Sequence, residues 1–470
     1  MVNTKKINKI MLLIIIILLA NSNLEAKQLT LNDAIKIGIQ NNSELKQAKF
    51  DIERAEAQVK EVFGNALPSL DFTTNFSHAL KTQIMPIDFE AMLMGTVYGV
   101  LWSEEVMSKH GVLTHDPSKL PSGNNFASLQ LKNNIQSQLQ LTQILFNSAV
   151  FTGIGVSRDF LDVSIAQYDA KRADVVMNIK NAFHAVLYTK EMLGIINASL
   201  ENAQANLNNV TALYNQGMLS EFTMLDAQVR VANIEPTVKQ LENAVKSATD
   251  GLKLLLDIPL NDEIEVVGSI NYVAEDLQDV DKFVSQALNN NLNINTLERA
   301  IKLTRATVDV SRADYFPTIA AFANYGYNAM SNTLSNWNTF PTSMVGISFS
   351  MNLFRGLQTK YRVQQSQIDV IKAEEQISFL RDAIAMQVRT NVNELNRIKK
   401  DIEAQTRNVS IAERAYSLAV IRFNEGIGNQ LEILNSDLAL RQAKTNLLES
   451  HYNYAISKAR LDNLLGNRND

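Results

Sequence analysis

The stretch LYNQGMLSEFTMLDAQ, residues 213–228, decides the fold, because it recurs 209 positions later as RFNEGIGNQLEILNSD, residues 422–437. In each copy an aromatic residue and an Asn close a run with helical apolar spacing, and a Gly follows. Glycine readily adopts the left-handed backbone that ends a helix, and Ser220 or Asn429 is placed to cap the next helix. Each copy therefore predicts the tip of a long helical hairpin, and the whole chain a tandem duplication.

The first 26 residues have the features of a secretory signal peptide. Lysines precede an apolar run from Ile10 to Ala20, and Leu24-Glu25-Ala26 offers a small-residue cleavage site. The apolar run is too short to span a bilayer comfortably. An uncleaved anchor is the alternative interpretation of this segment.

Composition narrows the classes of partner and of chemistry. The formal net charge is −5 for the whole chain, and removal of the lysine-containing N-terminus makes it more negative, which argues against a nucleic-acid partner. The chain contains no cysteine, so disulfides and thiolate chemistry are excluded. No further apolar run of about 18 residues follows Ala26, and an exported protein of this kind is expected to be either soluble or a β-barrel.

The apolar period changes from helix to strand at two prolines, Pro68 and Pro317. Proline cannot continue a helix. Strict alternation then predicts a strand pair within residues 69–146 in the first copy and two strands within 318–353 in the second. Residues 81–131 interrupt the first pair and are predicted to form a long extracellular loop.

Each strand pair leads into a very long helix. Between Val175 and Tyr214 apolar residues step by four and three in alternation, which is the heptad pattern of coiled-coil packing. A helix from Ser148 to Gly217 would be roughly 100 Å long at about 1.5 Å per residue. The return helix continues the seam through Phe222, Leu225 and Val229, and Pro236 is expected to bend it.

These patterns divide the chain into four segments. They are the signal peptide (1–26), a first repeat (27–256, tip near 217), a linker (257–282) and a second repeat (283–470, tip near 426). Both repeats have the order helix, strand, strand, long helix, tip and return helix. The fold class is therefore mainly α, with tandem-duplicated long α-hairpins and four β-strands per chain.

Four strands cannot close a barrel on their own, and an open edge in lipid leaves backbone polar groups unpaired at a cost of several kcal/mol each. Alternation of apolar and polar residues alone fits a half-solvated sheet in a soluble protein equally well. The signal peptide and the absence of apolar spanning helices favour a barrel with one face towards lipid and one towards water. Two chains would supply eight strands and three would supply twelve, so the sequence predicts an oligomer. A non-pore periplasmic coiled-coil protein, structural or adhesive, is the alternative.

This order of elements resembles the TolC-type outer-membrane efflux family. The resemblance rests on the paired prolines, on the two tips, and on Leu145-Phe146 and Leu353-Phe354 before the long helices. It implies a homotrimer in which a twelve-stranded β-barrel in the outer membrane continues as an α-barrel through the periplasm, with the linker and the chain ends forming an equatorial belt.

The resemblance also implies a function. The protein would be a passive channel, the exit duct of a tripartite efflux or type I secretion system, and not an enzyme. Its tips would dock onto a periplasmic adaptor (membrane fusion) protein, which couples it indirectly to an inner-membrane pump. The sequence leaves open which pump is served and whether drugs, metal ions or proteins are carried.

Two sets of candidate functional residues follow from this resemblance. In the family, two acidic positions just past the inner tip narrow the closed entrance; Glu432 occupies the first, and Asn435 departs from the pattern at the second. Asp226, the first-copy counterpart of Asn435, is expected to add an outer charge. A single carboxylate per chain predicts weaker cation selectivity and block, and a favourable charge in the first turn of a helix is the alternative role of Glu432.

The second set comprises residues expected to contact the adaptor at the tips. They are Asn215, Gly217, Met218, Leu219, Ser220, Asn424, Gly426, Ile427 and Asn429. Exposed apolar residues would be unusual on a tip without a partner. We find no nucleophile–base arrangement and no phosphate-binding loop, so no catalytic, cofactor-binding or metal site is predicted.

Overall fold

The computed structural model describes residues 27–81, 96, 131–270, 272 and 279–467. The predicted signal peptide and nearly all of the predicted loop 81–131 lie outside these residues. The chain divides into two compact units. The helical unit contains the chain up to Val59, Gly155–Val308 and the chain from Gln364 onward, and the strand unit contains Lys60–Ile154 and Asp309–Val363.

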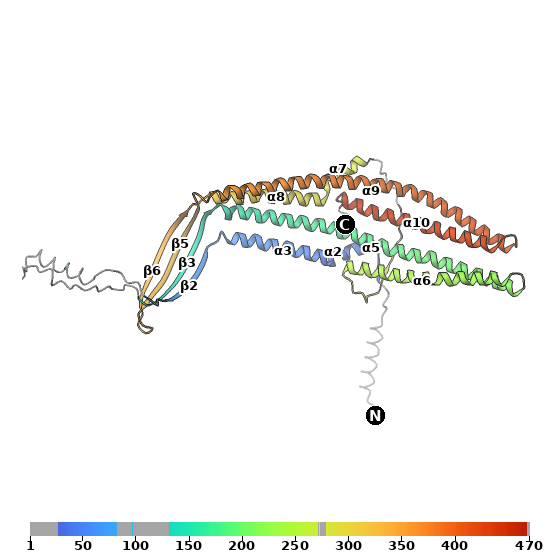
Figure 1. Ribbon diagram of the computed structural model, residues 1–470, viewed down its shortest axis with the longest axis horizontal. Coiled ribbons are helices and arrows are strands. Elements are labelled where there is room, and N and C mark those ends of the chain that lie inside the picture. Colours follow the sequence, from blue (N-terminus) through green and yellow to red (C-terminus); the bar gives the residue numbers. More distant parts are fainter. Residues whose placement is uncertain (1–26, 82–95, 97–130, 271, 273–278, 468–470) are drawn as a thin grey trace, which may run out of the picture. The chain divides into compact units, whose positions relative to one another are not determined.

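Eight long or medium helices follow one another in two matching sets among the described residues (Figure 1). The first set is α2 (Leu31–Asn41), α3 (Ser43–Gly64), α5 (Ser148–Asn215) and α6 (Glu221–Leu256). The second set is α7 (Val280–Asn290), α8 (Leu292–Arg312), α9 (Gln358–Asn424) and α10 (Gln430–Leu464). Helices α5 and α9 contain 68 and 67 residues, so the predicted pair of very long helices is confirmed. In the described part of the chain, no helix is both long enough and apolar enough to cross a membrane.

The seam predicted between Val175 and Tyr214 lies in the core of the first hairpin, and a matching buried row lies in the second. On α5, Ile196 and Ala203 pack with Val231 and Ile234 of α6. On α9 the buried seam residues are Val388, Val392, Leu395, Ile398 and Ile402, which cluster with Leu461 of α10. Helix α6 runs unbroken through Pro236, which lies between the buried residues Ile234 and Val238.

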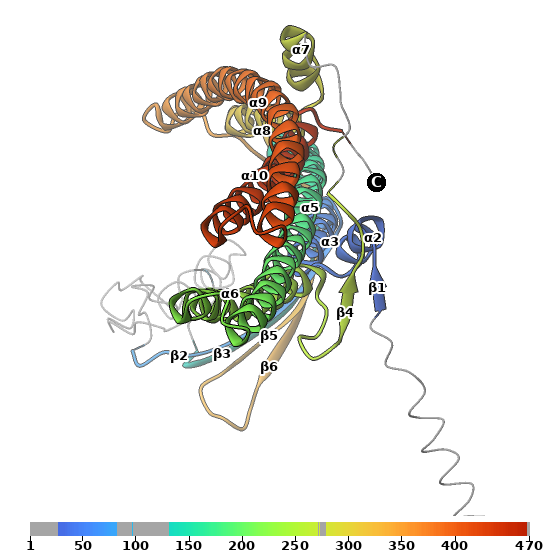
Figure 2. The ribbon, with the colours of Figure 1, turned by 90° about the vertical axis from the view of Figure 1, so that its right-hand side faces the viewer.

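Helix α10 also lies beside α5 of the other repeat, as Figure 2 shows from the end of the molecule. Thr445 of α10 contacts the sulfur of Met192 on α5 at 3.8 Å. The ring of Tyr188 on α5 lies 4.7 Å, between centroids, from the ring of Tyr452 on α10. The two hairpins are therefore packed against each other along α5 and α10.

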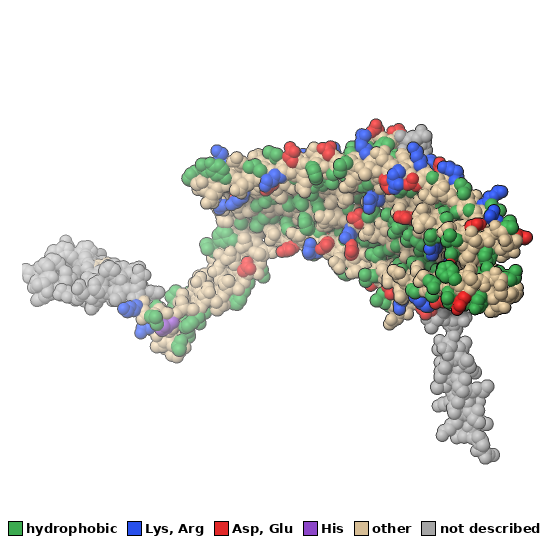
Figure 3. All heavy atoms as spheres, turned by 45° about the vertical axis from the view of Figure 1, so that its right-hand side comes forward, with side chains coloured by type: hydrophobic (Ala, Val, Ile, Leu, Met, Phe, Trp, Pro, Cys, Tyr) green, Lys and Arg blue, Asp and Glu red, His purple; other side chains and the backbone are tan. Residues whose placement is uncertain are grey.

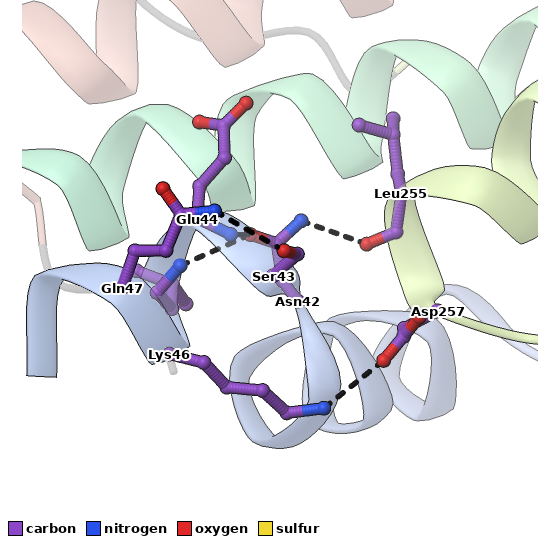
Figure 4. Close-up of polar contacts among 8 residues, drawn as sticks. Asn42, Ser43, Glu44, Lys46, Gln47, Leu255 and Asp257 are labelled. Carbon is purple, nitrogen blue, oxygen red and sulfur yellow. Dashed lines mark hydrogen bonds and ion pairs between the residues drawn. The ribbon is translucent and has the colours of Figure 1, made fainter. Parts of the chain in front are cut away.

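One buried Asn in each repeat joins the short helices to the end of the return helix, and Figure 4 shows Asn42 of the first repeat. The side-chain oxygen of Asn42 accepts the N–H groups of Glu44 and Leu45 at the start of α3, at 2.9 and 3.2 Å. Its amide nitrogen donates to the carbonyl of Leu255 at 2.8 Å. Asn291 repeats this arrangement, with contacts to Asn293, Ile294 and Leu464. The two repeats therefore share this arrangement at the level of single hydrogen bonds.

A small parallel sheet falls partly in the segment predicted to be a linker. Strand β1 (Lys27–Leu29) pairs with β4 (Ile264–Val266). Leu29 and Val266 are 1% and 4% exposed and belong to the core around α5 and α6. Strands of three residues are too short to show a period, so the sequence pattern did not predict them.

The strand unit contains one antiparallel sheet with the order β2-β3-β5-β6. Its strands are β2 (Ser69–His78), β3 (Asn133–Asn147), β5 (Thr318–Ser331) and β6 (Asn338–Ser350). The predicted strand pair of the first repeat is confirmed. The end predicted at 353 is wrong by three residues: the alternation continues past Ser350, but Gly356 and Leu357 then adopt left-handed backbones, φ 59° and 64°, and turn the chain into α9.

Candidate functional site

The first hairpin tip closes by the predicted left-handed glycine. Gly217 has φ 74°, its N–H donates to the carbonyl of Tyr214 at 2.8 Å, and the N–H of Met218 donates to Leu213 at 2.9 Å. This pair of bonds is the Schellman motif. The second tip repeats it with Gly426 at φ 73° and with bonds from Gly426 to Phe423 and from Ile427 to Arg422, both at 3.0 Å.

The predicted caps of the return helices are also present. The hydroxyl of Ser220 accepts the N–H of Thr223 at 3.3 Å, and the side-chain oxygen of Asn429 accepts the N–H of Glu432 at 3.0 Å. Both tips are therefore fixed by local hydrogen bonds. The exposed side chains next to them are free to meet a partner, whereas the glycines themselves are explained by the turn.

Each return helix carries an exposed apolar stripe that begins at its tip. In α6 the stripe is Met218, Phe222, Leu225 and Val229, which are 46–79% exposed. In α10 the matching positions are Ile427, Leu431, Leu434 and Leu438. Three of these are 51–69% exposed, and Leu434 is half-buried. Hydrophobic side chains show on the surface of the described helices in Figure 3.

These stripes correct two expectations. Phe222, Leu225 and Val229 are not part of the hairpin seam, because the seam of α6 begins with buried Ala227 and Val231. Leu219, which was expected to be exposed, is half-buried. Phe222 and Leu431 were not predicted as tip residues, although their matching positions, five residues after Gly217 and Gly426, were a usable signal.

The three predicted entrance residues are not brought together. Asp226 and Asn435 line a common groove between α6 and α10, with a volume of about 480 Å³. Apolar stripe residues of both helices, including Val229 and Leu434, line the same groove, whereas Glu432 is not among its lining residues. Glu432 instead lies in the first turn of α10, and its carboxylate accepts from Asn429 and Arg422, each at 3.3 Å.

One buried polar link near this groove escaped sequence analysis. Asp437 of α10 is bound by Arg230 of α6 and by Ser199 of α5. A signal was present, because Asp437 follows Ile433 and precedes Leu440 at helical spacing on the buried face. A carboxylate on such a face is rarely left without a partner.

The sheet of the strand unit presents apolar side chains in register across its strands. One row runs through Leu70, Leu141, Ala323 and Val345. Leu70, Leu141 and Val345 are 63%, 42% and 80% exposed. The neighbouring rows on the other face contain Asp71 with Gln140 and Asn324, and Thr73 with Gln138. One face is thus suited to hydrocarbon and the other to water.

The chain thus combines an exposed apolar sheet face with duplicated helical hairpins. Residues 283–467 match the family model described as outer membrane efflux protein. In sequence and in fold the chain is similar to the TolC-type outer-membrane efflux family. It is an outer-membrane exit duct for efflux or type I secretion, with its helical part in the periplasm. This family consists of channels and is not a family of enzymes.

Relatives of known function and solved structures agree with this assignment. The chain is 21% identical to outer membrane protein TolC of Salmonella enteritidis, over 72% of this chain and 70% of that protein. It is also 21% identical to the alkaline protease secretion protein AprF of Pseudomonas aeruginosa, over 69% and 68% of the two chains. The fold matches the outer-membrane channel OprN with a TM-score of 0.71, at 16% identity over 93% of this chain and 89% of that chain. The Campylobacter jejuni CmeC channel gives a TM-score of 0.71, at 17% identity over 93% and 85%.

Proposed function

We propose that three copies of the chain assemble into one continuous duct. The supporting observation is the sheet: in the described part of the chain β2 and β6 each pair on one side only, while the apolar side chains of β2 and β6 are exposed. Unpaired backbone groups at a sheet edge are costly in lipid. Pairing of β6 with β2 of the next copy would satisfy both edges, and three copies would give twelve strands, an even number in the usual range.

Cross-linking tests this assembly directly. The chain has no native cysteine, so single cysteines on β2 and β6 report only on contacts between the chosen positions. We expect cysteine pairs from the two outer edges to join different copies and to yield a trimer on denaturing gels. Pairs on β3 and β5, which are neighbours within one chain, are the control and should cross-link only within the monomer. A protein that stays monomeric in detergent with its full β-signal would contradict the proposal.

The conducting function has its own test. Purified trimer inserted into planar bilayers is expected to give discrete conductance steps. Silence from folded, inserted protein would instead favour a structural or adhesive role without a pore.

The tips are the proposed docking site for a periplasmic adaptor. Support comes from the exposed apolar stripes on α6 and α10, which occupy matching positions in the two repeats. Large apolar side chains exposed in a contiguous row usually mark a contact surface. The stripes, with Asn215, Ser220, Asn424 and Asn429 beside them, suit the apolar face of a helical hairpin on the partner.

A double substitution at the tips tests docking without disturbing the buried core of the hairpins. Phe222→Ser combined with Leu431→Ser removes one exposed side chain from each stripe, 79% and 62% exposed. We expect at least about a ten-fold loss of adaptor affinity, since buried aromatic and aliphatic anchors dominate such contacts, with conductance unchanged. Leu254→Ser is the matched control, because Leu254 is 77% exposed on α6 but lies at the far end from the tip. Equal effects of the two changes would refute docking at the tips.

Glu432 is the proposed charged residue of the periplasmic entrance, whereas Asn435 and Asp226 line the separate groove between α6 and α10. Support comes from the position of Glu432 at the exposed tip of the second hairpin, where its side chain is 39% exposed. A three-fold ring of one carboxylate per chain would favour cations at a narrow entrance.

A further inference from the structure

We propose that Arg422 sets the ion selectivity of the periplasmic entrance by neutralising Glu432. This inference rests on the proposed role of Glu432 at that entrance. It changes the expected charge of the entrance ring from three bare carboxylates to three ion pairs.

Arg422 is held in place by contacts at both ends of the residue. Its Nε lies 3.3 Å from a carboxylate oxygen of Glu432, and its Nη2 donates to the carbonyl of Ile427 at 3.3 Å. Its own carbonyl accepts the N–H groups of Ile427 and Gly428, at 3.0 and 2.9 Å. The guanidinium is therefore directed across the tip, towards the first turn of α10.

Gly428 lets the loop close onto Arg422. A Cβ at this position would lie 2.9 Å from the backbone nitrogen of Phe423, and 3.0 Å from both the carbonyl carbon and the Cβ of Arg422. Contacts this short require the backbone to move, so a larger residue would open the loop. Gly428 thus lets the loop lie against the backbone at position 422, which carries the Arg side chain.

The first tip shows that the hairpin turn does not need this arrangement. The counterparts of Arg422, Gly428 and Glu432 are Leu213, Leu219 and Thr223. The first tip nevertheless closes with the same pair of backbone bonds to the residues before Gly217. The ion pair is therefore an addition to the turn, present in only one of the two repeats, and its role lies outside helix capping.

The charge balance of the second tip follows from its sequence. Residues 421–435 carry one Arg and two Glu, namely Arg422, Glu425 and Glu432. The paired side chains of Arg422 and Glu432 are 52% and 39% exposed, and an exposed pair of this kind adds little to folding stability. The pair nevertheless alters the electric field that a passing ion meets, because a neighbouring charge within about 8 Å is not fully screened at physiological salt. Pairing therefore lowers the field that a lone carboxylate would exert.

Reversal potentials in planar bilayers under a KCl gradient test the inference. Arg422→Gln is expected to raise the potassium-to-chloride permeability ratio at least about two-fold, because it leaves the carboxylate unpaired. Glu432→Gln is expected to lower the ratio, and the double variant should return close to the original value. Arg422→Lys keeps the charge and should stay within about 1.5-fold of the parent protein.

The two single variants are expected to shift the permeability ratio in opposite directions, and this distinguishes an electrostatic role of Arg422 from a structural one. A purely structural role would make both single variants loosen the same tip and shift the ratio in the same direction, which would overturn the inference. Lys444→Gln is the matched control: it removes an exposed 2.9 Å pair with Glu413 that also joins α9 and α10 but lies further from the tip. It should leave the ratio unchanged.

The outcomes also separate this inference from the function on which it rests. If Glu432→Gln shifts the ratio and Arg422→Gln does not, the entrance assignment stands and the role of Arg422 is wrong. If neither variant shifts it while conductance steps persist, Glu432 does not face the entrance and both assignments fail. Absence of conductance in the folded parent protein would overturn the duct itself.

Discussion

Arg230 and Asp437 come from different repeats and form an ion pair largely removed from solvent. Nη2 of Arg230 lies 2.5 Å from Oδ2 of Asp437, and the hydroxyl of Ser199 donates to the same oxygen at 3.1 Å. The two side chains are 18% and 5% exposed. The pair joins α5 and α6 of the first hairpin to α10 of the second at one buried carboxylate.

Removal of Arg230 alone should be strongly destabilising. Arg230→Leu leaves Asp437 buried with a single hydroxyl donor, and breaking a buried pair from one side costs about 3–5 kcal/mol. The double variant Arg230→Leu/Asp437→Leu should recover much of this loss, because no charge then stays buried. Urea unfolding followed by helical circular dichroism measures both. Lys239→Leu breaks an exposed pair with Glu242 on the same helix and should cost at most about 1 kcal/mol; a similar cost for Arg230→Leu would disprove the argument.

Asn42 and Asn291 make equivalent hydrogen bonds in the two repeats, so replacing either should lower the free energy of unfolding by a similar amount. Asn42→Ala removes the cap of α3, worth about 0.5–2 kcal/mol, and leaves the carbonyl of Leu255 without its donor, which costs about 1–3 kcal/mol when buried. Asn291→Ala should cost at least as much, since Asn291 is 2% exposed and Asn42 5%. Asn42→Ser keeps a neutral capping acceptor for α3 and loses the amide donor to Leu255, so the free energy of unfolding should fall by less than for Ala. Equal losses for Ala and Ser would show that the cap contributes nothing.

Three glycines with left-handed backbones should respond differently to alanine. At Gly217 and Gly426 a Cβ meets nothing within 4 Å, so only the backbone conformation opposes the change, at about 1–2 kcal/mol. At Gly466, φ 66°, a Cβ would lie 2.1 Å from the carbonyl oxygen of Asn290. Gly466→Ala should therefore lower the free energy of unfolding by clearly more than Gly217→Ala. Identical thermal shifts for the three variants would contradict this ranking.

Because of the buried His184, the free energy of unfolding is expected to fall in mild acid. Burial, and secondarily the charge of Lys180, lower its pKa below the ordinary value of 6.5, and its ring packs 6.2 Å, between centroids, from that of Phe183. Below pH 6.5 the unfolded chain binds the proton more readily than the folded chain, so the free energy of unfolding declines as pH falls from 7 towards 5.

The variant His184→Gln should flatten this decline when urea unfolding is measured across that range. His451, whose pKa burial also lowers, leaves some slope in the variant. Glu191, whose pKa burial raises, acts in the opposite sense, because the folded chain holds its proton above pH 4.5. The comparison between variant and parent protein removes both contributions. A parallel slope in the two proteins would rule out His184 as the source.

The duplicated tips were predictable from the sequence because their determinants are local. Gly217, Ser220, Gly426 and Asn429 act on backbone groups within five residues. Period and proline placement likewise predicted the long helices and the strand pairs. The end of β6 was misplaced because alternation continues beyond Ser350, and hydrogen-bond partners, not side-chain period, decide where a strand ends.

The features that sequence analysis missed depend on which faces meet. Helical spacing reveals the apolar face of α6 near its tip, yet it does not tell whether Phe222 packs inside the hairpin or points outward. The pair of Arg230 and Asp437 joins residues 207 positions apart, a distance over which spacing carries no information. Arg422 and Glu432 are close in sequence, but their contact depends on the loop that Gly428 permits.

The pairing of Lys27–Leu29 with Ile264–Val266 has a consequence for biogenesis. The first residues of the predicted mature chain find their partner strand only in the second half of the polypeptide. During export the beginning of the chain must therefore wait until the middle has crossed the inner membrane. Leu29, which ends up 1% exposed, is without its partner strand throughout that interval.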